Sequence, residues 1–116
     1  MLPQKYRLSR QKDFEDIFKQ KKSSSSQFLS LFWRFNNLGF PRLAVVVSTK
    51  ISKKAVARNR LRRQLQEIIR LNFKKIKPGF DTVVVVKTGL IKREYLFIEK
   101  EFINLLKKIG LYFVND

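Results

Sequence analysis

The chain has 116 residues, the length of one domain, and we expect residues 1–116 to fold as a single unit. Its 44% hydrophobic content, with eleven Phe, excludes a chain too polar to form a core. The absence of Cys excludes a disulfide framework and a thiolate metal site. Because no apolar run approaches the roughly 20 residues that span a bilayer, and the first residues lack the apolar stretch of a secretion signal, we expect a soluble, cytoplasmic protein.

The dominant feature is charge. The sequence holds 26 Lys and Arg against 9 Asp and Glu, a formal net charge of +17. Such an excess favours a polyanionic partner. Nucleic acid is the first candidate and an anionic membrane surface the second, although a membrane-surface helix needs an exposed apolar face.

The N-terminal third predicts a helix followed by a strand. Residues 8–20 have apolar side chains at helical spacing, with Ser9 as the expected N-cap. The apolar face of this helix consists of Phe14, Ile17 and Phe18. The serine-rich residues 21–26 predict a loop, and residues 27–35 predict a strand. One face of that strand, which the alternation marks as a core face, carries Leu29, Leu31, Trp33 and Phe35.

The remaining elements alternate between strand and helix. Residues 42–49 are β-branched and nearly continuously apolar, which predicts a central strand. Residues 53–70 predict a long basic helix, and residues 82–88 a second buried strand. Residues 93–110 predict a final helix, with Gly110 suited to its C-terminal end.

The order helix, strand, strand, helix, strand, helix predicts an α/β (α+β) two-layer sandwich, with helices on one face of a small sheet. The strands at 42–49 and 82–88 are separated by enough chain for parallel pairing through a crossover. Such a crossover is normally right-handed.

The excess charge is concentrated between residues 50 and 75, where ten basic residues face one acid, Glu67. At 100° per residue, the helix separates a packing face from a polar stripe. The packing face consists of Ala57, Leu61, Leu65 and Ile68, and the stripe of Asn59, Arg62, Arg63, Gln66 and Arg70. Arg60 extends the stripe at its far margin, and Arg58 lies where the helix meets the sheet. A merely solvated helix would intersperse acids among these cations. Planar guanidinium groups beside an amide instead suit phosphate, sugar and base contacts.

Catalytic residues are not evident. The chain has no His and no Cys, so the usual general base, thiol nucleophile and soft metal ligands are missing. Solvation of one short helix explains Asp13, Glu15 and Asp16 better than binding of a divalent ion. We therefore expect no catalytic residues and no metal site formed by the protein alone. The function classes left open are an RNA-binding protein without catalytic residues, a general double-stranded RNA-binding module and a self-sufficient basic ribonuclease.

The segment KAVARNRLRR, residues 54–63, resembles the arginine–asparagine–arginine signature of the protein component of bacterial ribonuclease P. The surrounding segments agree in order: RLSRQKDFEDIF before it, RLAVVVSTK directly ahead of the helix and PGFDTVVVVK after it. The resemblance covers about residues 6–108, which is almost the whole chain.

This resemblance implies a fold of the ribosomal protein S5 domain 2-like type, with about four strands in a mixed sheet and a left-handed βαβ crossover. It implies an RNA-binding subunit that assists a catalytic RNA in the endonucleolytic removal of the 5′ leader from precursor tRNA. The chemistry then belongs to the RNA, and Mg²⁺ is required by the RNA-based holoenzyme rather than bound as a cofactor by the protein. One protein per RNA is expected.

The resemblance also implies site residues. The implied RNA-binding residues are Lys50, Lys53, Lys54, Arg58, Asn59, Arg60, Arg62, Arg63 and Arg70. A central cleft for the single-stranded leader would be lined by Phe14, Phe18, Leu29 and Leu31, with Arg58, Asn59 and Arg63 at its edge. Helical spacing alone would place Phe14 and Phe18 in the core, so the resemblance reverses that interpretation. Three positions differ from the family pattern. Leu31 stands where the family frequently has an aromatic residue, Lys53 where a glycine is common, and Gln66 where a basic residue is frequent.

Overall fold

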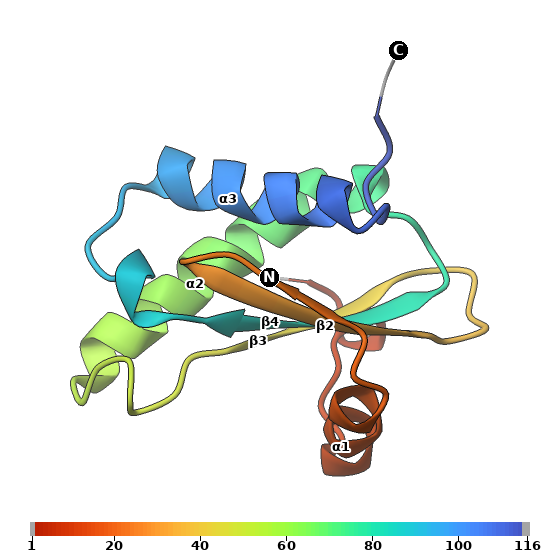
Figure 1. Cartoon of the computed structure of the whole chain (residues 1–116), viewed down its shortest axis with the longest axis horizontal. Helices are drawn as coiled ribbons and strands as arrows, with labels where there is room; N and C mark the ends of the chain where they lie inside the picture. Colours follow the sequence, from red (N-terminus) through yellow and green to blue (C-terminus); the bar gives the residue numbers. More distant parts are fainter. Residues whose placement is uncertain (1, 115–116) are drawn as a thin grey trace.

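The computed structural model describes residues 2–114 as one mixed sheet with helices packed on it (Figure 1). In chain order the elements are η1 (Gln4–Tyr6), α1 (Gln11–Lys19), β1 (Ser23–Ser25), β2 (Leu29–Phe35), β3 (Arg42–Val46), α2 (Ala55–Asn72), η2 (Phe73–Lys75), β4 (Phe80–Val86), η3 (Thr88–Leu90) and α3 (Tyr95–Lys108). The predicted α/β class and the four-stranded mixed sheet are confirmed, and the predicted helices and strands occur in the predicted order, with β1 as an additional strand.

The strands lie in the order β1-β2-β4-β3. β2 pairs antiparallel with β1 and β4, whereas β3 pairs parallel with β4, so α2 forms the predicted crossover between two adjacent parallel strands. The family resemblance predicts that this crossover is left-handed, and its handedness stays a prediction. β1 was expected to be a loop and is instead a short edge strand, because Ser23, Ser24 and Ser25 pair in register with Phe32, Leu31 and Ser30.

Helices cover both faces of the sheet, which departs from the expectation of helices on one face. In Figure 1, α2 and α3 lie on one side of the strands and α1 lies on the other. The face under α2 and α3 holds the main core, in which Leu65, Ile98 and Phe102 are fully buried. The face under α1 holds a small cluster whose buried members are Leu8, Ile17 and Val83.

The termini of the elements follow local chemistry. The predicted N-cap at Ser9 is wrong, because α1 begins at Gln11 with Arg10 as its N-cap and no side-chain cap. α2 begins two residues later than predicted and continues to Asn72. Gly110 ends the last helical segment with φ of 77°, a left-handed conformation that glycine adopts without penalty, as expected.

Candidate RNA-binding site

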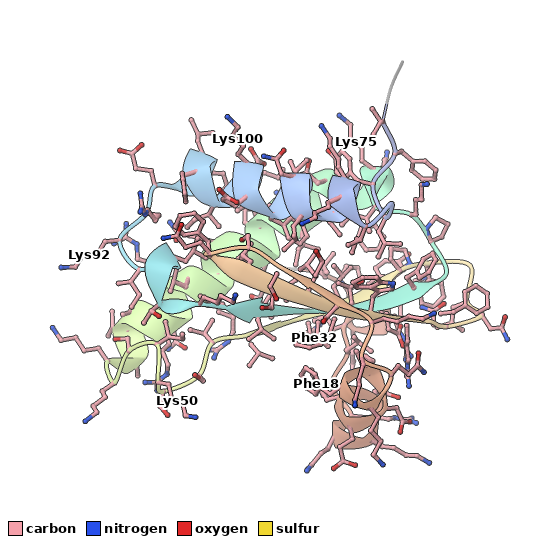
Figure 2. The ribbon with its side chains drawn as sticks, in the orientation of Figure 1. Phe18, Phe32, Lys50, Lys75, Lys92 and Lys100 are labelled. Atoms are coloured by element: carbon pink, nitrogen blue, oxygen red, sulfur yellow. The ribbon has the colours of Figure 1, made fainter. Side chains whose placement is uncertain are left out.

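The first turn of α2 is an exposed, uncapped helix N-terminus surrounded by cations. The loop after β3 brings Lys50, Lys53 and Lys54 to this end of the helix, and Figure 2 shows Lys50 extending from the same end of the molecule as Lys92. Lys54 is the N-cap but makes no side-chain cap, and the first turn contains no acid. Because the N-terminus of a helix carries partial positive charge, these lysines add to a potential that an anion would relieve.

The signature residues on α2 are fixed by their own hydrogen bonds. Arg58 is half-buried, and its Nη1 donates to the carbonyl oxygen of Ser52, in the loop ahead of α2, at 2.8 Å. Arg62 Nη1 donates to Asn59 Oδ1 at 2.8 Å. Asn59 therefore holds one guanidinium group in place and keeps its own amide N–H groups available to a ligand.

Other predicted RNA-binding cations have side chains without a partner in the described part of the chain, residues 2–114. Among residues 2–114, the side chains of five of these cations form no ion pair and no hydrogen bond: Lys50, Lys53, Lys54, Arg60 and Arg63. All five are exposed. Cations without an acidic partner among residues 2–114 suit a polyanion, whose condensed counterions are released when it binds.

Arg70 differs from these cations because it is paired. Its Nε and Nη2 donate to both carboxylate oxygens of Glu67, at 3.0 and 2.5 Å. The hydrogen bond between them raises the pKa of Arg70 and lowers the pKa of Glu67. Within residues 2–114, Arg70 is thus the predicted RNA-binding arginine that is paired with a carboxylate.

Three aromatic side chains gather where α1 packs on the sheet. Phe18 of α1 and Phe32 of β2 meet edge to face, with ring centroids 4.9 Å apart at 78°, and Figure 2 shows them pointing toward one another beneath the sheet. Phe18 is 41% exposed. Phe14 continues this surface into a pocket of about 320 Å³ that reaches Gln66 on α2. We call Phe14, Phe18 and Phe32 the aromatic cleft, and it runs toward the arginine-bearing helix.

Two predicted cleft residues do not lie there. Leu29 and Leu31 are fully buried in the main core, on the opposite face of the sheet from Phe18. Because side chains alternate along a strand, the cleft face of β2 carries Ser30 and Phe32 instead. The assignment of Leu29 and Leu31 to the cleft is therefore corrected, and their core placement by alternation is confirmed. Phe32 was missed, although it is the aromatic residue on the other face of the predicted strand.

Arg34 attaches α1 to the sheet. Its Nη2 donates to Asp13 Oδ1 at 2.9 Å, and its Nη1 lies 3.5 Å from Asp16 Oδ2. Its Nε donates to Asp81 Oδ2 on β4 at 3.0 Å. The sequence pattern predicted the acids of α1 to be solvating residues. Two of them, Asp13 and Asp16, instead hold α1, the helix that carries Phe14 and Phe18, to the sheet.

Asp81 is the buried centre of this network. It is fully buried and also accepts hydrogen bonds from Arg42, at 2.8 and 2.7 Å, and from Asn36 at 2.8 Å. Burial disfavours its charged form, but the hydrogen bonds from Arg42, Asn36 and Arg34 outweigh that effect and lower the pKa of Asp81. Three strands and α1 are therefore joined through one carboxylate.

The fold and this site define an RNA-binding α/β protein: an uncapped basic helix, unpaired cations and exposed aromatic rings lie on a small mixed sheet. No helix within residues 2–114 is long and apolar enough to cross a bilayer. Nor do these residues contain a group of three or more Asp, Glu, His or Cys placed to hold a metal ion.

Comparison with known proteins identifies the family. The family model described as Ribonuclease P matches residues 2–110. The ribonuclease P protein component of Clostridium botulinum (strain Loch Maree / Type A3) is 37% identical over 107 residues, which cover 91% of this chain and 96% of that protein. That of Alkaliphilus oremlandii is 35% identical over 105 residues, covering 90% and 91%. The solved ribonuclease P protein from Thermotoga maritima superposes with a TM-score of 0.83 at 35% identity, covering 90% of this chain and 97% of that one.

The chain belongs to the ribonuclease P protein family. As a member, it is an RNA-binding component of a tRNA-processing endonuclease.

Proposed function

We propose that this protein binds the catalytic RNA of ribonuclease P through the basic surface of α2, and that the RNA performs the hydrolysis that removes the 5′ leader from precursor tRNA. The observation that carries the proposal is the set of unpaired cations around the uncapped start of α2 in a member of this family. The sequence has no His and no Cys to act as a protein-borne base or thiol nucleophile. Because the described residues offer no fitting donor set, Mg²⁺ is assigned to the RNA.

The aromatic cleft is proposed to hold the single-stranded leader. Phe18 and Phe32 present an accessible ring surface, and bases stack on such rings with little sequence preference. Cations on α2 lie toward one end of the cleft, where they meet the leader phosphates. Arg58, half-buried near the start of α2, and the pocket between Phe14 and Gln66 support this direction. The assembly is proposed to contain one protein per RNA and to act in the cytoplasm.

Reconstitution tests the proposal. The purified protein is combined with the ribonuclease P RNA encoded in the same genome, at low Mg²⁺, with a precursor tRNA as substrate. Leader removal should accelerate only when protein and RNA are both present. Cleavage by protein freed of nucleic acid would instead indicate a self-sufficient ribonuclease. Equal affinity for any A-form duplex, without stimulation of cleavage, would indicate a general double-stranded RNA-binding module.

The basic surface is tested by Arg58→Ala and Arg63→Ala. Each variant should weaken association with the ribonuclease P RNA by about 1–3 kcal/mol. Lys100→Ala is the matched control, because Lys100 is an exposed cation on the outer side of α3 (Figure 2). Normal affinity and normal holoenzyme activity of both arginine variants across a salt series would refute the assignment.

The cleft is tested by Phe14→Ala and Phe18→Ala. Loss of one stacking ring should weaken binding of leader-bearing precursor by about 1–3 kcal/mol and leave binding of mature tRNA unchanged. Phe35→Ala is the control, because Phe35 is 63% exposed but packs on Phe80, outside the cleft. Equal losses for precursor and mature tRNA would indicate damage to the fold instead.

A further inference from the structure

A second pocket lies on the other side of α2 from the aromatic cleft. It has a volume of about 440 Å³ and is enclosed by the first turns of α2 and by the connection between β4 and α3. Its apolar surface comes from Val56, Ala57, Leu61 and Ile91. Val56 is 78% exposed, an apolar side chain left uncovered within the most basic helix of the chain. This size and lining suit a small, flat, largely apolar group.

All the charged residues that line this pocket are basic. Lys54 and Arg60 stand on the α2 side, and Lys92 and Arg93 on the side of the β4–α3 connection. No Asp or Glu lines the pocket. The uncapped N-terminus of α2 adds its partial positive charge at the same place. An anionic group attached to the apolar one would therefore be attracted from both sides.

Arg93 is held in position on two aromatic rings. Its guanidinium carbon lies 5.2 Å from the ring centroid of Phe28 and 4.8 Å from that of Phe97, and its Nε donates to the Gly89 carbonyl oxygen at 3.3 Å. The two rings meet edge to face, with centroids 4.8 Å apart. Stacking leaves the other N–H groups of the guanidinium free to contact a phosphate without a further loss of side-chain entropy.

The neighbouring Lys92 has a left-handed backbone, with φ of 65°. That region is uncommon for residues other than glycine and is unfavourable for a lysine. The turn thus carries a strained cation where glycine or asparagine would relax it. Figure 2 shows Lys92 extending from the same end of the molecule as Lys50.

We propose that this pocket captures one unpaired nucleotide of the catalytic RNA, with the base against Val56, Ala57 and Ile91 and the flanking phosphates on Arg60, Lys92 and Arg93. The inference rests on the proposed function and adds a second, separate contact to it. Ser52 and Gln64 supply a hydroxyl and an amide that can bond to base edges.

The catalytic RNA is the assigned source because of where the pocket opens. Gln66 and Ile69, on one side of α2, line the pocket that continues the aromatic cleft. Ala57, Arg60 and Gln64, on the other side, line the second pocket. Figure 1 shows α1 on the opposite side of the strands from α2. A leader bound on the α1 face would therefore lie away from the second pocket, which is lined by α2 and the β4–α3 connection. The arginine–asparagine–arginine signature therefore has two sides. Arg58 lies on the side of α2 that faces the cleft, and Arg60 lines the second pocket.

Two variants test the pocket in binding assays with the ribonuclease P RNA encoded in the same genome. Ala57→Phe fills the pocket while keeping every charge, and should weaken RNA binding by about tenfold. Lys92→Gly removes one cation and relaxes the left-handed turn, so the fold should be at least as stable while the slope of log affinity against log salt falls by about 1. Lys100→Ala is the control and should leave affinity and slope close to those of the wild type.

The outcomes separate this inference from the proposed function. If Arg58→Ala and Arg63→Ala lose affinity while Ala57→Phe and Lys92→Gly bind like the wild type, the pocket assignment is overturned and the proposed function stands. If the wild-type protein itself shows no preference for the ribonuclease P RNA, the proposed function fails.

Crosslinking provides a test that does not depend on the stability of Ala57→Phe. Because the chain has no Cys, Lys92→Cys gives a single site for a short photo-crosslinker. In the reconstituted holoenzyme with precursor tRNA, it should react with one unpaired nucleotide of the catalytic RNA, whereas Lys100→Cys should not. Reaction with the leader, with another protein molecule or with no nucleotide would overturn the proposal.

Discussion

The two faces of the sheet differ in how completely they are covered. The face under α2 and α3 is closed, and its large side chains, such as Phe102 and Ile98, are fully buried. The face under α1 is open: the helix is nine residues long, buries Ile17 and leaves Phe18 41% exposed. One face thus holds most of the core, and the other keeps apolar ring surface accessible next to the cations of α2.

This difference has a simple origin in strand geometry. Alternate residues of β2 point to opposite faces, so Leu29 and Leu31 join the core while Ser30 and Phe32 face α1. Since burial of apolar area is the main stabilising contribution, substitutions on the two faces should separate stability from binding.

Phe102→Ala should have the largest effect on stability. Its ring is fully buried on the closed face, so the substitution removes apolar contacts and leaves a cavity. We expect the free energy of unfolding to fall by about 3–5 kcal/mol, measured by urea denaturation. Phe18→Ala on the open face should cost less, about 1 kcal/mol, because Phe18 is already 41% exposed and less apolar area is lost. Similar losses for the two variants would contradict the distinction between the faces.

Asp81→Ala should have the next largest effect, because Asp81 joins three strands and holds Arg34, the residue that attaches α1 to the sheet. Removing this buried carboxylate leaves Arg34 and Arg42 without their shared partner. We expect a loss of about 3 kcal/mol in the free energy of unfolding. Glu15→Ala is the matched control, because Glu15 is an exposed carboxylate on α1 and should change stability by less than about 0.5 kcal/mol.

The same residue makes stability depend on pH. The pKa of Asp81 is lowered in the folded protein from its ordinary value of 3.8, so its contribution is fully present above that pH. The contribution is lost as the pH falls from 3.8 through the folded pKa, where the folded carboxylate takes up its proton. A denaturation series should therefore show a steeper acid loss for the wild type than for Asp81→Ala, and parallel curves would contradict the prediction.

Arg34→Lys should have a smaller effect, confined to the open face. A lysine keeps the positive charge but cannot bond to Asp13 and Asp81 together through a planar fork. We expect a loss of about 1–2 kcal/mol in stability and increased hydrogen exchange in α1 with α3 unaffected. Arg10→Lys, at an exposed position, is the control. Equal exchange changes in α1 and α3 would show that the network supports the whole fold instead.

Periodicity and composition predicted the elements that bury apolar stripes. The long basic helix, the strands around residues 43 and 83 and the final helix were all found from their spacing. β1 was missed because three serines carry no apolar alternation; its pairing depends on β2, where Ser25 and Ser30 lie with hydroxyl oxygens 2.8 Å apart. An edge strand of this kind has no local signal.

The residues of the site that tertiary structure brings together were harder to predict from the sequence. The unpaired arginines follow from the helix alone, and the sequence predicted them. The network of Asp13, Arg34 and Asp81 joins positions far apart in the chain, so no spacing indicates it. The only local signal is a carboxylate inside an apolar strand, at Asp81, because a buried charge requires a partner. The second pocket likewise needs Ile91 and Arg93 beside α2, which only the packing of α3 provides.

Tyr95→Phe should have the smallest effect and the opposite sign. Tyr95 packs against the closed core, but its buried hydroxyl oxygen has no hydrogen-bond partner within residues 2–114, and burial raises the pKa of the group. Removing a buried, unpaired hydroxyl should leave stability unchanged or raise it by up to about 1 kcal/mol. The measurement is the urea midpoint at constant slope.

Tyr112→Phe provides the matched comparison for this last prediction. The Tyr112 hydroxyl is also on the closed side, but it donates to Asn72 Oδ1 at 3.2 Å. Its removal should cost about 1 kcal/mol, because a made hydrogen bond is lost and its acceptor is left with one partner fewer. The same chemical change is thus expected to stabilise at one position and destabilise at the other. If Tyr95→Phe proved as costly as Tyr112→Phe, the Tyr95 hydroxyl would have a partner in solution, and the closed face would be less dry than its packing indicates.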